Sequence, residues 1–408
     1  MAVVDVGGDL TSWQYPACIF RPENVAQLQQ AVSYIVAGNA SFAIRSGGHN
    51  PAPGAANIDN GVLIDMSGFN GIEYDAESNV VMIGAGLRWD AVYSQLEQYN
   101  VTVVGGRVLD VGVGGLILGG GLSYLADLYG LPCDNVVNFE VVLADGSLAN
   151  ANAESNSDLF WALKGAGNNF GIVTSFTLSA YPLPQVWGGV KTYAWEDLPM
   201  LHAAMLEYQL NPQKDPYANV MLQGFPINET IGIVLSMVYL KPEMFPPAFE
   251  PFYSINTTSD STTLSTYYEF LATQGSVDLP RSVTAGSLAF GLQPISSTAI
   301  QAGYASGGNA LGLQDVSQTW YAIDVGWYWE SDDEFIRSAT VDLIGAVTKA
   351  SEEEDSFIRY LFMNDANREQ DVIASYGEGN VRKLRDVQIK YDPDLVFQRL
   401  VPGGWKLP

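Results

Sequence analysis

The sequence predicts an α+β protein with two domains, and three observations lead to this expectation. The chain has 408 residues, more than one ordinary domain needs, and 47% of them are hydrophobic, which is enough for a large core. Short strands, helices and glycine-rich loops fill the first part of the chain. After Pro184 the glycine-rich loops end, and long strands are expected to alternate with helices. We therefore place domain boundaries at 1–185, 186–358 and 359–408.

The elements before Pro184 follow from apolar spacing. Pro22 is expected to open a helix, because proline at the first helical position loses no hydrogen bond, and apolar residues then recur at helical spacing up to Ile35. Ser157 is expected to cap a helix that runs to Leu163. A further helix is expected at 89–99, and strands at 42–44, 62–65, 80–83, 101–104 and 171–180.

A hairpin is expected at 137–147. Its first strand is indicated by the alternation of Val137, Phe139, Val141 and Leu143, and its turn by Ala144-Asp145-Gly146-Ser147. In the middle region, strands are expected at 186–193, 231–240 and 320–329, and helices near 199–210 and 332–349. These elements predict a separate domain built on an antiparallel sheet.

Composition excludes several classes of partner. The chain has 45 acidic and 19 basic residues, a formal charge of −26, so nucleic acid and anionic lipid would be repelled. No run of 18 uncharged apolar residues occurs, so no membrane insertion is expected. The two cysteines, Cys18 and Cys133, are too few for a metal cluster, and Cys133 is expected to be a buried thiol.

The cellular location is left open by two opposing signals. Sequons begin at Asn39, Asn100, Asn228 and Asn256, and they favour a secreted glycoprotein. The first ten residues, however, contain neither the basic nor the apolar part of a leader, so a cytoplasmic location remains an alternative.

Three glycine-rich patches carry the chemistry. The first, Arg45-Ser46-Gly47-Gly48-His49, follows a strand and contains one of only two histidines, and its glycines allow backbone N–H groups to approach an anion such as phosphate. The second runs from Asp110 to Gly121 and the third from Lys164 to Thr174. No G-x-G-x-x-G is present, so this is not a dinucleotide-fold fingerprint. Taken alone, the glycines would be better explained as tight turns in a crowded sheet.

In this order and spacing, the three patches resemble those of the flavin-linked oxidases of the vanillyl-alcohol oxidase superfamily, specifically the berberine-bridge-enzyme-like branch. The resemblance covers nearly the whole chain. It implies a bipartite FAD-binding domain, formed by 1–185 and 359–408, and a substrate domain between them. Family members carry a helical segment before the Pro16-Ala17-Cys18 stretch, so the first part of the domain is expected to be missing here.

The resemblance assigns the cofactor to named residues. The histidine of the R-S-G-G-H loop carries FAD covalently in this family, which implies attachment at His49. Val108 stands where doubly attached members have cysteine, so a single attachment is implied. The other residues implied in FAD binding are Arg45, Ser46, Gly47, Gly48, Asn50, Asp110, Val111, Gly114, Gly115, Gly119, Gly120, Gly121, Asn168, Gly171, Ile172, Val173 and Asn364.

Catalytic roles are implied for three residues. Asn364 matches a family asparagine that touches the flavin ring, and Val111 matches a valine that leaves room for O2, although a buried core valine is the alternative. Phe362 stands where many relatives have a tyrosine base, which closes that route. Independently of the resemblance, the alternation of residues 320–329 makes Asp324 the candidate base, because aromatic neighbours would raise the pKa of its carboxyl group; a solvated strand face or a paired structural acid is the alternative.

We therefore expect an oxidase that takes hydride from a small natural-product intermediate and is reoxidised by O2. A carbohydrate oxidase is one alternative, but it would need a polar groove where this chain is rich in Trp, Tyr and Phe. A non-redox pericyclase that retains FAD as a scaffold is a second, and a flavin-free binding or allergen-like protein, which a yellow preparation would exclude, is a third.

Overall fold

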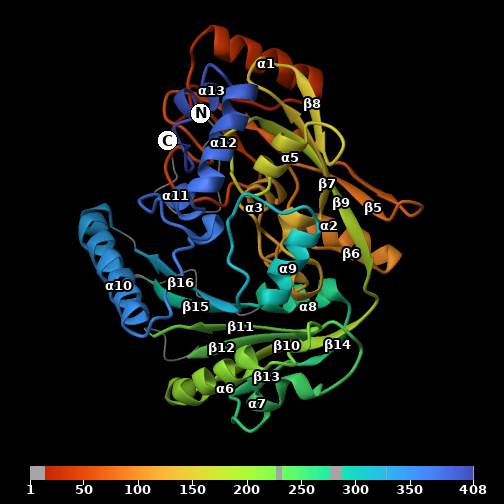
Figure 1. Cartoon of the computed structure of the whole chain (residues 1–408), viewed down its shortest axis with the longest axis vertical. Helices are drawn as coiled ribbons and strands as arrows, with labels where there is room; N and C mark the ends of the chain where they lie inside the picture. The colour runs from red at the N-terminus through yellow and green to blue at the C-terminus, as the bar shows by residue number, and fades with distance from the viewer. Residues whose placement is uncertain (1–13, 227–231, 276–286, 328, 408) are drawn as a thin grey trace. The chain divides into compact units, whose positions relative to one another are not determined.

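The computed structural model describes residues 14–226, 232–275, 287–327 and 329–407. The chain forms two compact units (Figure 1). The first comprises residues 1–184, 299–314 and 360–408, and the second comprises 185–298 and 315–359. Residues 299–314, which the sequence grouped with the middle region, therefore belong to the first unit. The sequon at Asn228, the start of the strand expected at 231, and the first ten residues lie outside the described ranges.

The first unit contains a small parallel sheet and a larger antiparallel one. The parallel sheet has the order β1-β3-β2 and consists of β1 (Cys18–Phe20), β2 (Phe42–Arg45) and β3 (Val62–Asp65). The larger sheet has the order β4-β5-β9-β7-β8, with β6 also paired to β9. Its strands are β4 (Ile72–Asp75), β5 (Val80–Gly84), β6 (Val101–Val103), β7 (Val136–Val142), β8 (Leu148–Asn152) and β9 (Ile172–Pro182).

Helices connect and cover these strands. The described helices of the unit are α1 (Val25–Ala37), α2 (Trp89–Leu96), α3 (Val113–Leu118), α4 (Ala126–Tyr129), α5 (Ser157–Leu163), α11 (Val372–Ser375), α12 (Glu378–Tyr391) and α13 (Val396–Arg399). The helix expected at Pro22 begins at Val25 instead, because the side chain of Asn24 accepts a hydrogen bond from the backbone N–H of Gln27 and caps it. Ser157 is the first residue of α5, and Asn156 precedes it as the cap.

The hairpin of β7 and β8 is confirmed, with one correction. The register of β7 on β9 shifts between Val136 and Asn138. This irregularity turns Val137 outward, and its side chain is 42% exposed rather than buried with Phe139. The buried thiol expected at Cys133 is found, and Cys18 is exposed.

The second unit is built on an antiparallel sheet, as the sequence predicts. Its order is β13-β10-β12-β11-β15-β16, with β14 also on β10. The strands are β10 (Val186–Tyr193), β11 (Ala218–Gly224), β12 (Ile233–Tyr239), β13 (Ser259–Asp260), β14 (Thr263–Ser265), β15 (Ser287–Ile295) and β16 (Gln318–Gly326). All seven residues of β12 are buried, as a central strand requires.

Helices complete the second unit and its core. They are α6 (Leu198–Leu210), α7 (Glu250–Tyr253), α8 (Tyr267–Gly275), α9 (Ser297–Ala305), which crosses the unit boundary, and α10 (Asp333–Glu353). Apolar side chains from β10, β11, β12, α6 and α7 form one core cluster. By contrast, α10 buries none of its residues, and its Phe335 is 73% exposed. No helix of the described residues is long and apolar enough to cross a bilayer.

Candidate cofactor cavity

The histidine loop begins where β2 ends, and a buried ion pair fixes that end. Arg45 Nη2 lies 3.0 Å from Asp65 Oδ2 at the end of β3, with both side chains less than a tenth exposed. Burial alone would raise the pKa of the Asp65 carboxyl, but hydrogen bonds from Ser67 and Arg45 outweigh it and hold that pKa below its ordinary value. Arg45 therefore stabilises the start of the loop through Asp65 and does not line the cavity, contrary to the expectation from the sequence.

The backbone of the loop then packs against the backbone of the second glycine patch so closely that no side chain fits between them. A Cβ placed on Gly47 would lie 2.5 Å from the backbone of Gly112, and one on Gly112 would lie 2.3 Å from the backbone nitrogen of Gly47. Arg88 joins the same two segments, because its Nη2 donates to the Gly47 carbonyl (2.7 Å) while its Nη1 pairs with Asp110 (3.1 Å). Asp110 therefore acts through Arg88 and lies outside the cavity wall.

The second patch folds partly into a helix, although the sequence predicted a loop. Gly114 and Gly115 lie within α3. The backbone N–H of Gly114 donates to Ser46 Oγ (3.2 Å), and this hydroxyl donates to the Ala85 carbonyl (2.6 Å). A Cβ on Gly115 would meet nothing within 4 Å, which leaves its face open to the cavity.

Asn364 ties the C-terminal segment to this patch. Its Oδ1 accepts from the backbone N–H of Gly121 (3.0 Å), and its Nδ2 donates to the Gly115 carbonyl (3.1 Å). A Cβ on Gly119 would lie 2.5 Å from the Asn364 amide. The run Gly119-Gly120-Gly121 thus makes room for Asn364 and does not itself line the cavity.

The third patch binds the last residues of the chain. Asn169 donates from Nδ2 to the Trp405 carbonyl (2.9 Å), and its Oδ1 accepts from the backbone N–H of Leu407 (3.2 Å). Asn168 donates from Nδ2 to the Gly403 carbonyl (3.1 Å). These bonds hold Gly404 and Trp405 against the cavity.

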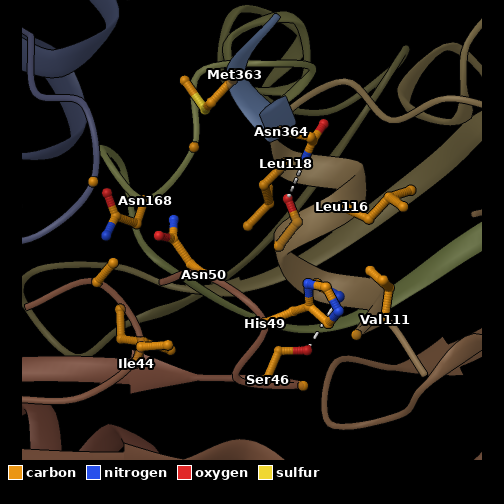
Figure 2. Close-up of a pocket in the computed structure, with 18 of the residues that line it drawn as sticks. Ile44, Ser46, His49, Asn50, Val111, Leu116, Leu118, Asn168, Met363 and Asn364 are labelled. Carbon is orange, nitrogen blue, oxygen red and sulfur yellow. Dashed lines mark hydrogen bonds between the residues drawn. The ribbon is translucent and has the colours of Figure 1, made fainter. Parts of the chain in front are cut away.

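All of these segments surround one cavity of about 410 Å³, which lies wholly within the first unit. Figure 2 shows His49 and Val111 toward one end of the cavity and Asn50 and Asn168 toward the other, with Asn364 contributed from the C-terminal segment. Of the residues predicted from the sequence, those on the wall are Ser46, Gly47, Gly48, His49, Asn50, Val108, Val111, Gly114, Gly115, Asn168, Gly171, Ile172, Val173 and Asn364.

Asp324 lies elsewhere, in β16 of the second unit. It pairs across the sheet with Ala289, and its side chain is exposed, so it is not enclosed by aromatic residues as expected. Tyr328, which regular alternation would place on the same face as Asp324, is outside the described residues.

Several wall residues were missed by the sequence reasoning. Arg107, Asp365 and the Gly404–Trp405 segment are among them, with the apolar residues Ile44, Met66, Leu116, Leu118 and Phe176. The Gly403-Gly404 pair was an available signal, because paired glycines often mark close backbone approach. The apolar residues could not be told from ordinary core positions.

The wall fits FAD in its chemistry. Gly48 has φ of +73°, the left-handed conformation in which consecutive N–H groups can converge on phosphate. Apolar side chains and the open face of Gly115 suit a planar ring system, and the amides of Asn50 and Asn168 suit polar groups.

Comparison with known proteins agrees with this chemistry. The FAD binding domain family matches residues 16–152. The chain is 35% identical to a bifunctional solanapyrone synthase of Alternaria solani, over 97% of this chain and 82% of that protein. It is 33% identical to an FAD-dependent monooxygenase of Cochliobolus heterostrophus, over 96% of this chain and 85% of that protein.

Solved structures share the fold. The 6-hydroxy-D-nicotine oxidase of Arthrobacter nicotinovorans superposes with a TM-score of 0.82 at 20% identity, covering 98% of this chain and 94% of that one. The carbohydrate oxidase of Microdochium nivale superposes with a TM-score of 0.77 at 20% identity, covering 95% and 92%. The chain therefore belongs to the FAD-dependent oxidoreductases that these fungal relatives represent, and it has the fold of solved flavin oxidases, a BBE-like protein of Physcomitrella patens among them.

Proposed function

We propose that this protein is an FAD-dependent oxidase that carries FAD covalently through His49 and oxidises a small natural-product intermediate. One observation carries the proposal. His49 is the histidine of the glycine nest, and its exposed imidazole stands in the wall of the cavity that fits FAD. The imidazole of histidine can present an uncharged, nucleophilic nitrogen near neutral pH, as attachment to a flavin carbon requires.

FAD, when bound, supplies two-electron chemistry: it takes hydride from a substrate and returns the electrons to O2 as H2O2. The residues of this chain must then orient the substrate and take up its proton. Phe362 is buried on the cavity wall and cannot accept a proton. Asp365, three residues further along, also lines the cavity and is a second candidate base, and Asp324 remains the candidate in the second unit.

The substrate class is supported by the cavity lining and by the relatives. The apolar residues of the cavity wall include Val111, Leu116, Leu118, Leu122, Phe362 and Met363. The part of this lining that bound FAD leaves uncovered would favour an apolar or aromatic substrate over a sugar. The relative from Alternaria solani is named a synthase of solanapyrone, a fungal product.

Acid precipitation of the purified protein tests the attachment. We expect the yellow colour to stay in the pellet, and mass spectrometry to find FAD on the peptide that contains His49. His49→Ala should lose this bond and still bind FAD, because the glycine nest and the ring contacts remain. Colour released from wild type, or covalent FAD retained by His49→Ala, would contradict attachment at His49.

The reaction class is tested by product and oxygen measured together. A panel of polyketide and aromatic alcohols should yield one peroxide for each product molecule, whereas xylo- and cello-oligosaccharides should not bleach the flavin anaerobically. Product formed without oxygen uptake would point to a pericyclase, and rapid bleaching by oligosaccharides to a carbohydrate oxidase.

We also propose passage through the secretory pathway. The described sequon asparagines Asn39, Asn100 and Asn256 are all exposed, as acceptors of glycan must be. Native protein from its source should shift in mass after endoglycosidase treatment, and an unchanged mass would favour the cytoplasm.

A further inference from the structure

A cation stands behind the cavity wall in the C-terminal segment. Gly404 and Trp405 line the cavity, and Lys406 follows them directly. The Nζ of Lys406 donates to Oδ1 of Asn168 at 2.8 Å, and Asn168 is itself a wall residue. Burial lowers the pKa of the Lys406 ammonium to about 7.

The half-buried Lys406 has no ion pair among the described residues; the fully buried Lys164 has none either, but its Nζ lies over the ring of Phe160. Arg45 pairs with Asp65 and Lys191 with Asp260, whereas no carboxylate among the described residues lies within ion-pair distance of Lys406. The chain has 45 acidic residues against 19 basic ones, so a partner was readily available. A desolvated charge that meets only a neutral amide is costly, and an apolar residue there would fold more easily. The missing countercharge is therefore expected from a ligand.

The cavity side of the same contact presents amide hydrogens. Asn168 uses Oδ1 for Lys406 and one Nδ2 hydrogen for the Gly403 carbonyl, so its second hydrogen is left for the cavity. Asn50 is oriented in the same way, because its Oδ1 accepts from the backbone N–H of Ala52 (2.9 Å) and leaves its NH2 group available. Both amides line the cavity, and Figure 2 shows them facing the same part of it, away from His49.

The segment that holds Lys406 is rigidly placed. A Cβ on Gly403 would lie 2.1 Å from the backbone of Gly54, and one on Gly404 would lie 2.7 Å from Asn168 Oδ1. Gly54 follows closely after the histidine loop, so the loop and the Lys406 segment are packed together. This packing fixes the cation relative to the glycine nest at Gly47 and Gly48.

We propose that Lys406, Asn168 and Asn50 form an anion site for the diphosphate of FAD, in which Lys406 supplies the charge and the two amides donate hydrogen bonds. The ammonium polarises the Asn168 amide through its oxygen, which strengthens the remaining N–H as a donor. Lys406 is thus a positioning residue that acts through Asn168. The inference rests on FAD as the cofactor of the proposed function, but not on attachment at His49.

The experiment compares a flavin that has the diphosphate with one that lacks it. In a His49→Ala background, where FAD is exchangeable, the Kd values of FAD and of riboflavin are measured for the parent, Lys406→Met and Lys406→Arg. We expect Lys406→Met to weaken FAD binding about tenfold or more and to leave riboflavin binding unchanged, since the charge acts through Asn168 on the diphosphate, which riboflavin lacks. Lys406→Arg, which keeps the charge, should restore most of the FAD affinity.

A matched control is Lys383→Met, which removes the same charge from α12, where Lys383 lies over the ring of Trp161. It should change neither Kd. Equal weakening of FAD and riboflavin by Lys406→Met would reveal a merely structural role, and an unchanged FAD affinity would equally overturn the proposal. If wild type proves to release its FAD, attachment at His49 fails, and the same comparison is made in wild type.

A second measurement needs no change at position 406. In the cofactor-free His49→Ala protein, modification of Lys406 by an amine reagent is followed by peptide mass spectrometry. ADP, which carries the diphosphate, should slow the reaction about tenfold, whereas adenosine should not. Equal effects of ADP and adenosine, or no effect of either, would contradict the anion site.

Discussion

Two carboxylates, those of Asp365 and Asp324, are candidates for the catalytic base. Asp365 lines the cavity next to Asn364, and Asp324 lies exposed on β16 of the second unit. We expect the variant of the true base to lower the rate of flavin reduction by roughly 10²-fold, because an amide keeps the shape and loses the proton affinity. Stopped-flow reduction of Asp365→Asn and Asp324→Asn separates the two, with FAD content unchanged in both. Wild-type rates in both variants would remove both carboxylates from the mechanism.

The Arg45–Asp65 pair supports the histidine loop, and removing the pair should lower the free energy of unfolding. Asp65→Asn leaves the Arg45 guanidinium buried without a countercharge, which costs about 3–5 kcal/mol. The folded pKa of Asp65 lies below its unfolded value, so its contribution is complete above about pH 4 and is lost as the pH falls through the folded pKa. Urea unfolding of wild type and variant should therefore differ most at neutral pH and converge in acid.

Arg21 provides the control for that experiment. It also pairs with Asp65, at 3.2 Å, but its side chain is 64% exposed. Arg21→Ala should cost about 1 kcal/mol or less. A loss as large as that of Asp65→Asn would show that the buried partner is not the dominant one.

For single residues, the sequence predicted which of them lie near the cavity better than it predicted where each side chain points. His49, Asn168 and Asn364 were expected at the cofactor and do line the cavity, because glycines and flanking strands leave their side chains few alternatives. Arg45 was misplaced, because its pairing depends on Asp65, which is 20 residues away and adjacent only through the β2–β3 register. Such long-range partners have no signature in local spacing.

Among the elements, the crossing of the histidine loop and the start of α3 is the tightest contact. Gly112→Ala puts a methyl group 2.3 Å from the Gly47 backbone nitrogen, so the two segments must separate. We expect a loss of about 1–3 kcal/mol in unfolding free energy and a lower fraction of FAD-loaded protein. Flavin absorbance relative to protein absorbance, together with the melting temperature, measures both effects.

Gly379→Ala serves as the comparison, because a Cβ there meets nothing within 4 Å and the residue lies in the first turn of α12. It should load FAD fully and melt no lower than wild type. If Gly112→Ala behaved like Gly379→Ala, the close crossing would not govern assembly of the cavity.

The elements were largely predictable because their apolar periodicity is strong. The strands expected at 62–65 and 186–193 match β3 and β10 at both ends, since buried β-branched runs fix their limits. At α1 the cap formed by Asn24, and not the proline, sets the first residue of the helix. In β7 a register shift breaks the alternation at Val137. The short helix α3 was missed because its two glycines disfavour a helix in isolation, and its position depends on contacts with Ser46 and Asn364.

For the whole molecule, the position of the cavity within the first unit has a thermodynamic consequence. A ligand stabilises the structure that it binds by mass action, by about 2.7 kcal/mol at one hundred times its Kd. Residues 1–184, 299–314 and 360–408 supply the entire described wall, and the second unit has its own core around β12. Stabilisation by FAD should therefore be concentrated in one part of the chain.

Hydrogen exchange of His49→Ala, with and without saturating FAD, measures this distribution. We expect amides of β2, β3, α3 and β9 to exchange up to about 100-fold more slowly with FAD, because their slowest exchange requires opening of the unit that binds it. Amides of β11 and β12 should change little, since the core that protects them is formed by β10, β11, β12, α6 and α7. Equal gains in β12 and β9 would show instead that the two units open as one cooperative body, with FAD stabilising both.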